Sequence, residues 1–171
     1  MSAMKIAGFA IIAIIFAVPL FAQDFAPLPA PPSVLGVPFY LDISAGELKK
    51  LPMEPYKNYD PVPGIFTMSQ ALEVKGAASA FRIPNQNKIV FVYDATTIPR
   101  LYKFTVNGSK RKFEYGKVNV RNSTPVEGLT ISISRYKETA FQFSSDQTLS
   151  PGEYAILFGD RLYTFGVDDK K

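Results

Sequence analysis

Cysteine and histidine are both absent from this chain of 171 residues. No disulfide can form, and neither a thiolate nor an imidazole is present to bind zinc, copper or haem iron. Cysteine nucleophiles and histidine-based catalytic triads are excluded for the same reason. Tryptophan is absent as well, which weakens a case for stacking on sugar rings. We therefore expect no metal, no cofactor and no catalytic residues.

A strong charge of either sign is also missing. The formal net charge is +4, with Lys and Arg contributing 19 residues against 15 Asp and Glu. This mild basicity gives no case for nucleic acid as a partner. Hydrophobic residues make up 47% of the chain, so a packed domain is expected rather than disorder. The length leaves room for one such domain and a targeting segment.

The first 22 residues have the layout of a signal peptide. Met1–Lys5 carries one positive charge, Ile6–Val18 is an uncharged apolar run, and polarity returns at Gln23. The apolar run is shorter than the roughly 20 residues that cross a bilayer as a helix, so cleavage after Ala22 is favoured. The alternative is an uncleaved anchor over residues 6–22. Either way the chain is expected to be exported, periplasmic or secreted, and the lack of cysteine favours a bacterial envelope.

Residues 23–36 form a Pro-rich linker, which composition predicts to be an extended spacer. A single domain is expected over residues 37–168, followed by a charged tail at residues 169–171. Asp168 and Asp169 are adjacent carboxylates, but the tail is a poor place for general acid–base chemistry.

Short apolar runs that alternate with turn residues predict strands throughout the domain. Residues 65–75 fit either a strand or a short helix, and a strand is preferred although Gln70 interrupts its period of two. Residues 54–63 are expected to be a loop. The strands expected from the pattern are Phe39–Ile43, Glu47–Met53, Ala77–Ile83, Lys88–Tyr93, Leu101–Val106, Lys112–Tyr115, Lys117–Arg121, Leu129–Ser134, Ala140–Phe143, Tyr154–Phe158 and Leu162–Val167.

Turn residues separate several of these strands. Asn107-Gly108 is the strongest hairpin signal, and Pro151-Gly152 suits a tight turn. After that turn Glu153 is expected on the solvent side, and Gly166 is expected to mark a bulge or a close approach of the backbone. The pattern as a whole predicts an all-β fold, a single antiparallel β-sandwich that is Ig-like or similar.

Three stretches of the domain have a familiar order. They are Gly36–Pro52, Gly76–Tyr93 and Leu149–Asp168, the last containing PGEYAIL and ending in FGVD. Together they resemble a loose group of bacterial exported proteins with a β-sandwich-like domain and no established activity. The resemblance covers most of the mature chain, although its motifs are short. It implies the fold and export, and it implies no catalytic residue.

The densest basic segment is Lys110-Arg111-Lys112, beside the Asn107-Gly108 hairpin. A basic hairpin of this kind is a candidate contact surface for anionic lipid headgroups, cell-wall polymers or an acidic partner. The competing interpretation, which is favoured, is a solvated tip whose charges keep a sheet edge from pairing with other chains.

The loop at residues 54–63 carries Tyr56 and Tyr59 and is the best candidate for a partner contact. A purely structural loop is the competing interpretation.

Three functions follow in order of preference. The first is a non-enzymatic envelope protein whose β-sandwich binds another protein or serves in assembly, through a sheet edge or the tyrosine loop. The second is a binding module for anionic lipid or cell-wall polymer that uses the basic hairpin. The third is a hydrolase based on Ser–Lys or carboxylate pairs, for which no residues are brought together by the pattern.

Overall fold

The computed structural model describes residues 27–59, 68–118, 123–137 and 139–169. The predicted signal peptide or anchor, residues 1–22, lies outside the described residues, as do the start of the linker and the last two residues of the tail. No helix that is long and apolar enough to span a membrane occurs within the described ranges.

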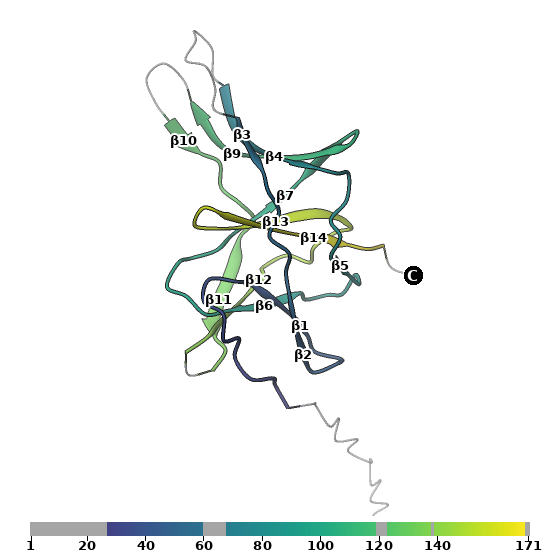
Figure 1. The fold of residues 1–171 in the computed structure, drawn as a ribbon, viewed down its shortest axis with the longest axis vertical. Helices are drawn as coiled ribbons and strands as arrows, with labels where there is room; N and C mark the ends of the chain where they lie inside the picture. Colours follow the sequence, from purple (N-terminus) through teal and green to yellow (C-terminus); the bar gives the residue numbers. More distant parts are fainter. Residues whose placement is uncertain (1–26, 60–67, 119–122, 138, 170–171) are drawn as a thin grey trace, which may run out of the picture.

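The fold is all-β, and its strands form three sheets that pack together (Figure 1). The β6 sheet has the order β11-β12-β6-β1-β2, the β13 sheet has the order β5-β14-β13-β7, and the β9 sheet has the order β10-β9-β4-β3 with β8 also paired to β9. Every pairing between these strands is antiparallel except that of β5 with β14. The strand bounds are β1 Phe39–Asp42, β2 Glu47–Lys50, β3 Lys57–Tyr59, β4 Met68–Lys75, β5 Arg82–Ile83, β6 Val90–Tyr93, β7 Arg100–Lys103, β8 Thr105–Asn107, β9 Lys110–Val118, β10 Ser123–Pro125, β11 Ile131–Arg135, β12 Phe141–Ser145, β13 Gly152–Phe158 and β14 Arg161–Val167.

The β13 sheet is the middle layer, between the β6 sheet below and the β9 sheet above in the view of Figure 1. Side chains of β13 alternate between the two interfaces, as the period of two requires. Tyr154, Ile156 and Phe158 join the core shared with the β6 sheet. Ala155 and Leu157 contact the core shared with the β9 sheet. A strand covered on both faces has no polar face, which explains the continuous apolar runs in this part of the sequence.

Aromatic rings dominate the core between the β6 and β13 sheets. Phe91, fully buried on β6, has its ring centroid 5.2 Å from that of Phe143 and 4.9 Å from that of Phe165 on β14. Tilted and offset rings at such separations add to the stabilisation from buried area. The central strand expected at residues 88–93 therefore forms the core of its sheet.

A third cluster of apolar side chains lies on the outer face of the β6 sheet, and part of the Pro-rich linker packs there. The Tyr136 hydroxyl donates to the Pro29 carbonyl at 2.9 Å, and Lys137 Nζ donates to the Leu28 carbonyl at 2.8 Å. Pro32 is buried. The described end of the linker thus lies against the domain rather than standing off as a spacer.

Most of the expected strands are confirmed; the one expected at residues 65–75 is a strand from Met68 to Lys75, and residues 65–67 lie outside the described residues. Its register shifts between Gln70 and Ala71, at the interruption noted in the sequence. The hairpin at Asn107-Gly108 is confirmed by the pairing of Asn107 with Lys110 and by the positive φ of Gly108.

The expected bounds of several segments were wrong. The loop predicted at residues 54–63 contains β3, which pairs with the free edge of β4. The strand predicted at residues 77–83 is reduced to the two residues of β5. The segments expected at residues 112–115 and 117–121 form one strand, β9, up to Val118.

Candidate functional site

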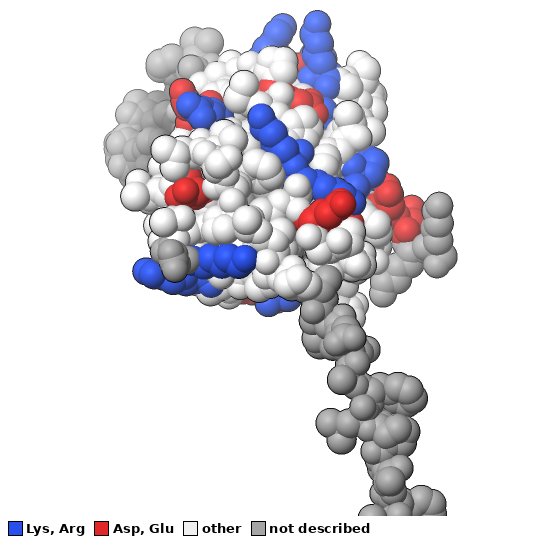
Figure 2. Space-filling model, turned by 60° about the horizontal axis from the view of Figure 1, so that its bottom comes forward, with Lys and Arg blue, Asp and Glu red and all other residues white. Residues whose placement is uncertain are grey.

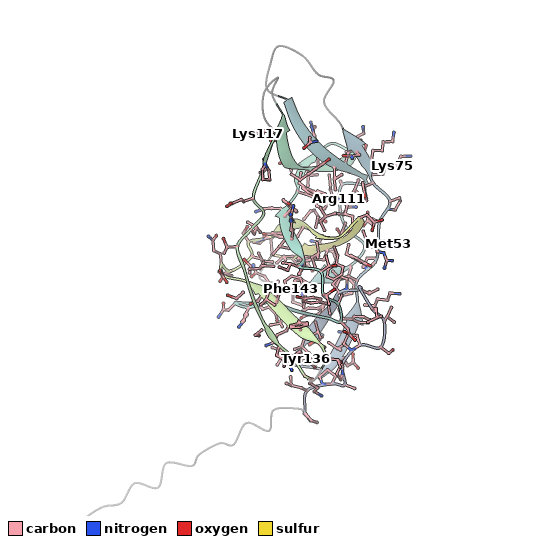
Figure 3. The ribbon with its side chains drawn as sticks, turned by 90° about the vertical axis from the view of Figure 1, so that its left-hand side faces the viewer. Met53, Lys75, Arg111, Lys117, Tyr136 and Phe143 are labelled. Carbon is pink, nitrogen blue, oxygen red and sulfur yellow. The ribbon has the colours of Figure 1, made fainter. Side chains whose placement is uncertain are left out.

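Arg111 does not lie on the surface with Lys110 and Lys112. Its side chain is only 1% exposed, so its predicted role in an exposed basic patch is wrong. The cause is the alternation of β9: Arg111 points to the same side as the buried Phe113, whereas Lys110 and Lys112 point outward. Figure 3 shows Arg111 within the stack of sheets.

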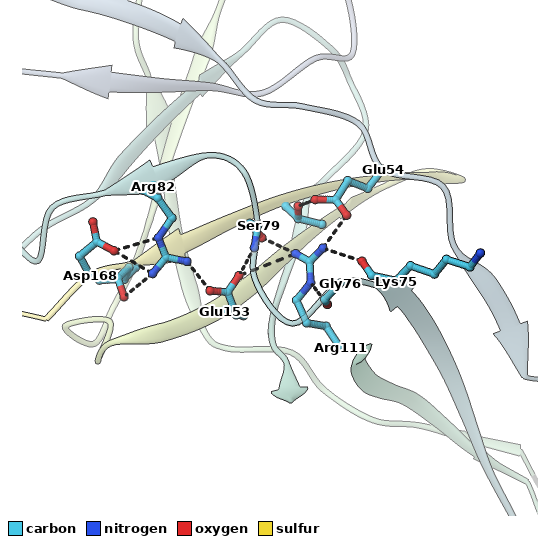
Figure 4. Close-up of polar contacts among 10 residues, drawn as sticks. Glu54, Lys75, Gly76, Ser79, Arg82, Arg111, Glu153 and Asp168 are labelled. Carbon is cyan, nitrogen blue, oxygen red and sulfur yellow. Dashed lines mark hydrogen bonds and ion pairs between the residues drawn. The ribbon is translucent and has the colours of Figure 1, made fainter. Parts of the chain in front are cut away.

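The Arg111 guanidinium is held by groups from several segments (Figure 4). Nη2 donates to Glu54 Oε2 at 2.6 Å and to the Lys75 carbonyl at 3.2 Å. Nε donates to the Gly76 carbonyl at 3.0 Å, and Nη1 donates to the Ser79 hydroxyl. Residues 77–79, which do not form the expected strand, directly follow the two backbone carbonyls that Arg111 binds.

Glu153 continues the network from the middle sheet. It lies 3.7 Å from Arg111 Nη1, accepts a hydrogen bond of 2.7 Å from the Ser79 amide, and pairs with Arg82. Its side chain is 6% exposed, so the expectation that it faces solvent was wrong. Glu153 has the same parity on β13 as Ala155 and therefore faces the β9 sheet.

The charges in this network alternate in sign along the row Asp168, Arg82, Glu153, Arg111 and Glu54. Thr164 ends the row by donating its hydroxyl proton to Glu54. Burial lowers the pKa of the Arg82 guanidinium, but its hydrogen bonds to Glu153 and Asp168 outweigh this effect, so the pKa is raised and the group stays charged. We call these five charged residues with Ser79 and Thr164 the buried ion network, after its buried members Arg111 and Glu153; Arg82 and Asp168 form its partly exposed end.

The buried ion network is structural. Each of its charges is matched by a partner, as buried charges require, and the network joins the β13 and β9 sheets at one end of their interface. It also fixes two surface segments, because Arg111 binds both Glu54, just before β3, and the carbonyl of Lys75, at the end of β4.

Those two segments form the walls of a surface pocket of about 290 Å³, the lysine pocket. The β4 and β9 strands supply side chains that point away from the core, and the segment leading into β3 supplies the rest. Its lining residues are Pro55, Tyr56, Lys57, Glu73, Lys75 and Lys110.

Positive charge exceeds negative charge in the lysine pocket. Lys75 and Lys110 are directly opposite each other in the β4–β9 register. Lys57 is opposite Glu73 across β3 and β4, and Lys110 Nζ pairs with Glu73 at 2.8 Å. Three lysines and one glutamate leave a formal charge of 3 − 1 = +2.

The two tyrosines of the predicted loop, Tyr56 and Tyr59, lie in different surroundings. The Tyr56 hydroxyl donates to the Asp160 carbonyl at 2.8 Å, which fixes its half-buried ring as one wall of the pocket. Tyr59 is in register with Ala71, and its side chain lies outside the described part of the structure. The two predicted contact regions therefore meet at Tyr56 and Lys110, while Lys112 lies one row away, opposite Glu73.

Basic residues elsewhere are dispersed. Figure 2 shows Lys and Arg spread over one face of the molecule among uncharged residues, several of them beside acidic side chains. The described residues include no group of three or more Asp or Glu side chains that could hold a metal ion.

Lys57 and Lys75 were not recognised as site residues from the sequence. They are far from Lys110 along the chain, and only the pairing of β3, β4 and β9 brings them together. The burial of Arg111 did have a signal, since Arg111, Phe113 and Tyr115 recur with a period of two against Lys110, Lys112 and Glu114. No protein-family model, curated protein or solved structure matches this chain.

Proposed function

We propose that this chain is an exported, non-enzymatic binding protein whose lysine pocket takes an anionic group of an envelope component. The ligand chemistry is a phosphate or carboxylate, presented by a lipid headgroup, a cell-wall polymer or a small molecule. The observation that carries the proposal is the direct pairing of Lys75 with Lys110 beside Lys57 and Tyr56.

Two like charges directly opposite each other on a sheet oppose folding. The ion pair with Glu73 stabilises Lys110, but stability alone gives no reason for Lys75. Protection of a sheet edge explains a lysine on an outer strand such as β3. It does not explain Lys110, because β9 at this residue lies between β4 and β8, and the pairing of β3 with β4 ends at Glu73, short of Lys75. An anion bound between the two ammonium groups would remove their repulsion.

The shape of the lysine pocket suits a headgroup-sized ligand. Its volume of about 290 Å³ is at the lower end of the range of roughly 300–1,000 Å³ seen for small-molecule sites. In the described part of the chain, neither Lys57 nor Lys75 has an acidic side chain within ion-pairing distance. Their ammonium groups are therefore able to donate to a ligand, and Figure 3 shows Lys75 at the surface.

The test is a titration of the full chain with inorganic phosphate and, separately, with vesicles of phosphatidylglycerol or phosphatidylcholine. Binding should weaken steeply as salt is added. Lys57→Ala and Lys75→Ala should each weaken it by about tenfold or more, as expected for the loss of a charge-assisted hydrogen bond. Lys88→Ala removes an exposed lysine that lies just before β6, outside the lysine pocket, and should leave binding unchanged.

The two arms separate the sources of the ligand. Binding to phosphatidylglycerol vesicles without binding to phosphate indicates a membrane surface, and binding to both indicates a free or polymer-borne anion. Binding that does not depend on salt concentration would refute the proposal. So would binding that is weakened equally by Lys88→Ala and by Lys75→Ala.

Export is the second part of the proposal, and it rests on the order of charge and hydropathy in residues 1–22. A tag placed after Lys171 allows the chain to be recovered from its native cells with its crosslinked partners. A mature chain beginning at Gln23 supports a cleaved signal, whereas one that retains residues 1–22 supports a tethered protein. An untethered chain confined to the cytosol would contradict export.

A further inference from the structure

A second hollow, of about 810 Å³, opens on a different part of the surface from the lysine pocket. It lies along the outer edge of β14, where two segments of the chain cover that edge. Residues 52–54 pair with β14 near Tyr163, and β5 pairs with its end. The hollow is lined by side chains from both segments, among them Leu51, Met53 and Phe81, with Tyr163 behind them.

Met53 presents an unpaired backbone edge at this hollow. The amide of Glu54 donates to the Leu162 carbonyl at 2.9 Å, and the amide of Thr164 donates to the Pro52 carbonyl at 3.3 Å. Because these two bonds flank the Met53–Tyr163 bridge, the N–H and C=O groups of Met53 itself point away from β14. No described residue bonds to either group, so both are available to an added strand.

The side chains around this edge are apolar in the middle and basic at the margins. Met53 is 63% exposed, which is unusual for a large apolar side chain beside other apolar groups. The charged residues that line the hollow are Lys50 and Arg161, both exposed and both positive. The nearest acidic neighbour in sequence, Glu54, is directed into the buried ion network.

We propose that this hollow binds an extended segment of another protein, in which an apolar side chain is flanked by acidic residues. The segment pairs its backbone with Met53, which places alternate side chains toward the hollow. Its apolar side chain covers Met53 and Phe81, and its carboxylates reach Lys50 and Arg161. The site is independent of the lysine pocket, since the two share no lining residue.

The probe is a blocked hexapeptide that alternates glutamate with valine or phenylalanine, and the control peptide has lysine in place of glutamate. Amide exchange and chemical shifts of the isotope-labelled full chain are measured with each peptide up to a concentration on the order of 1 mM. We expect the acidic peptide to slow exchange at the Met53 amide. Met53→Asp and Lys50→Glu should each weaken its binding by about tenfold or more.

Ile98→Asp is the matched control, because Ile98 is 69% exposed and lies outside the hollow. It should leave peptide binding unchanged. The proposal is overturned if the acidic peptide does not bind, if the lysine peptide binds equally well, or if binding leaves exchange at Met53 unaltered. Binding of decanoate in place of the peptide would identify the hollow as a site for amphiphiles and would also overturn it.

Discussion

Gly166 lies between Arg82 and Glu153, at a position where any side chain would block their contact. Arg82, Gly166 and Glu153 form a single row across β5, β14 and β13, with Gly166 in the middle. A Cβ atom at Gly166 would overlap Arg82 Nη1 and would lie 2.8 Å from Glu153 Oε1. The guanidinium therefore crosses β14 over a residue that has no side chain, which confirms the close approach predicted at this glycine.

Gly166→Ala should lower the free energy of unfolding by about 1–3 kcal/mol, the usual range for inserting atoms into a packed site. Its backbone has no positive φ, so the loss is steric rather than conformational. Urea denaturation measures the change. In an Arg82→Ala background the same substitution should cost much less, because the overlapping atoms are gone; equal costs in both backgrounds would contradict this account.

Arg111→Met should destabilise the fold by about 3–5 kcal/mol, because it leaves the largely buried carboxylate of Glu54 without its ion-pair partner and leaves Glu153 with Arg82 as its one remaining arginine. Arg111→Lys should recover only part of the loss, since an ammonium cannot reproduce the bonds of the guanidinium to Glu54, Ser79 and two backbone carbonyls. Denaturant titration followed by circular dichroism measures both variants.

Arg100→Met is the matched control for Arg111→Met. Arg100 is an exposed strand arginine, and its replacement should change the unfolding free energy by less than about 0.5 kcal/mol. A similar effect of the two substitutions would show that Arg111 is not the centre of the buried ion network.

Lys75→Glu should make the protein more stable while abolishing anion binding. The change replaces a like-charge pair with Lys110 by an opposite-charge pair, which is worth about 0.2–1 kcal/mol on a sheet. The same substitution reverses the charge of one wall of the lysine pocket. Thermal denaturation and phosphate titration are the two measurements, and a less stable variant would show that the repulsion inferred for Lys75 and Lys110 is absent.

The β1–β2 hairpin should lose stability in acid. Hydrogen bonds from Lys49 and then Ser44 lower the pKa of Asp42 to about 2. Because this folded-state pKa is below that of an unfolded aspartate, the contribution of Asp42 is complete above about pH 4 and is lost as the pH falls toward 2. The free energy of unfolding is measured from pH 6 to pH 2 for the wild type and for Asp42→Asn. The wild type should be the more stable above about pH 4, and this difference should disappear as the pH falls toward 2. A difference in unfolding free energy that stays constant with pH would exclude the Asp42 carboxylate as its source.

Local pattern was enough to identify the strands that are long or carry clear turn signals. The strand at Phe39–Asp42 and the Asn107-Gly108 turn each depend on neighbours in the chain, and each is confirmed, although both faces of that strand are buried at Tyr40 and Leu41. The short strand β3 escaped prediction because its conformation comes from pairing with β4, not from its own residues, and β5 is the end of a longer strand that was expected at residues 77–83. The sequence of β3 contains charged and turn-forming residues that favour a loop when considered alone.

The sequence by itself excluded cysteine- and histidine-based chemistry and determined the all-β class and the alternation that turns Arg111 inward. The tertiary structure decided which sheet faces are covered, and therefore that Arg111 and Glu153 meet in one interface while Lys57, Lys75 and Lys110 meet on the outside. The physical reason is that strand periodicity fixes which side chains share a face, but only the pairing and stacking of distant strands fixes what that face contacts.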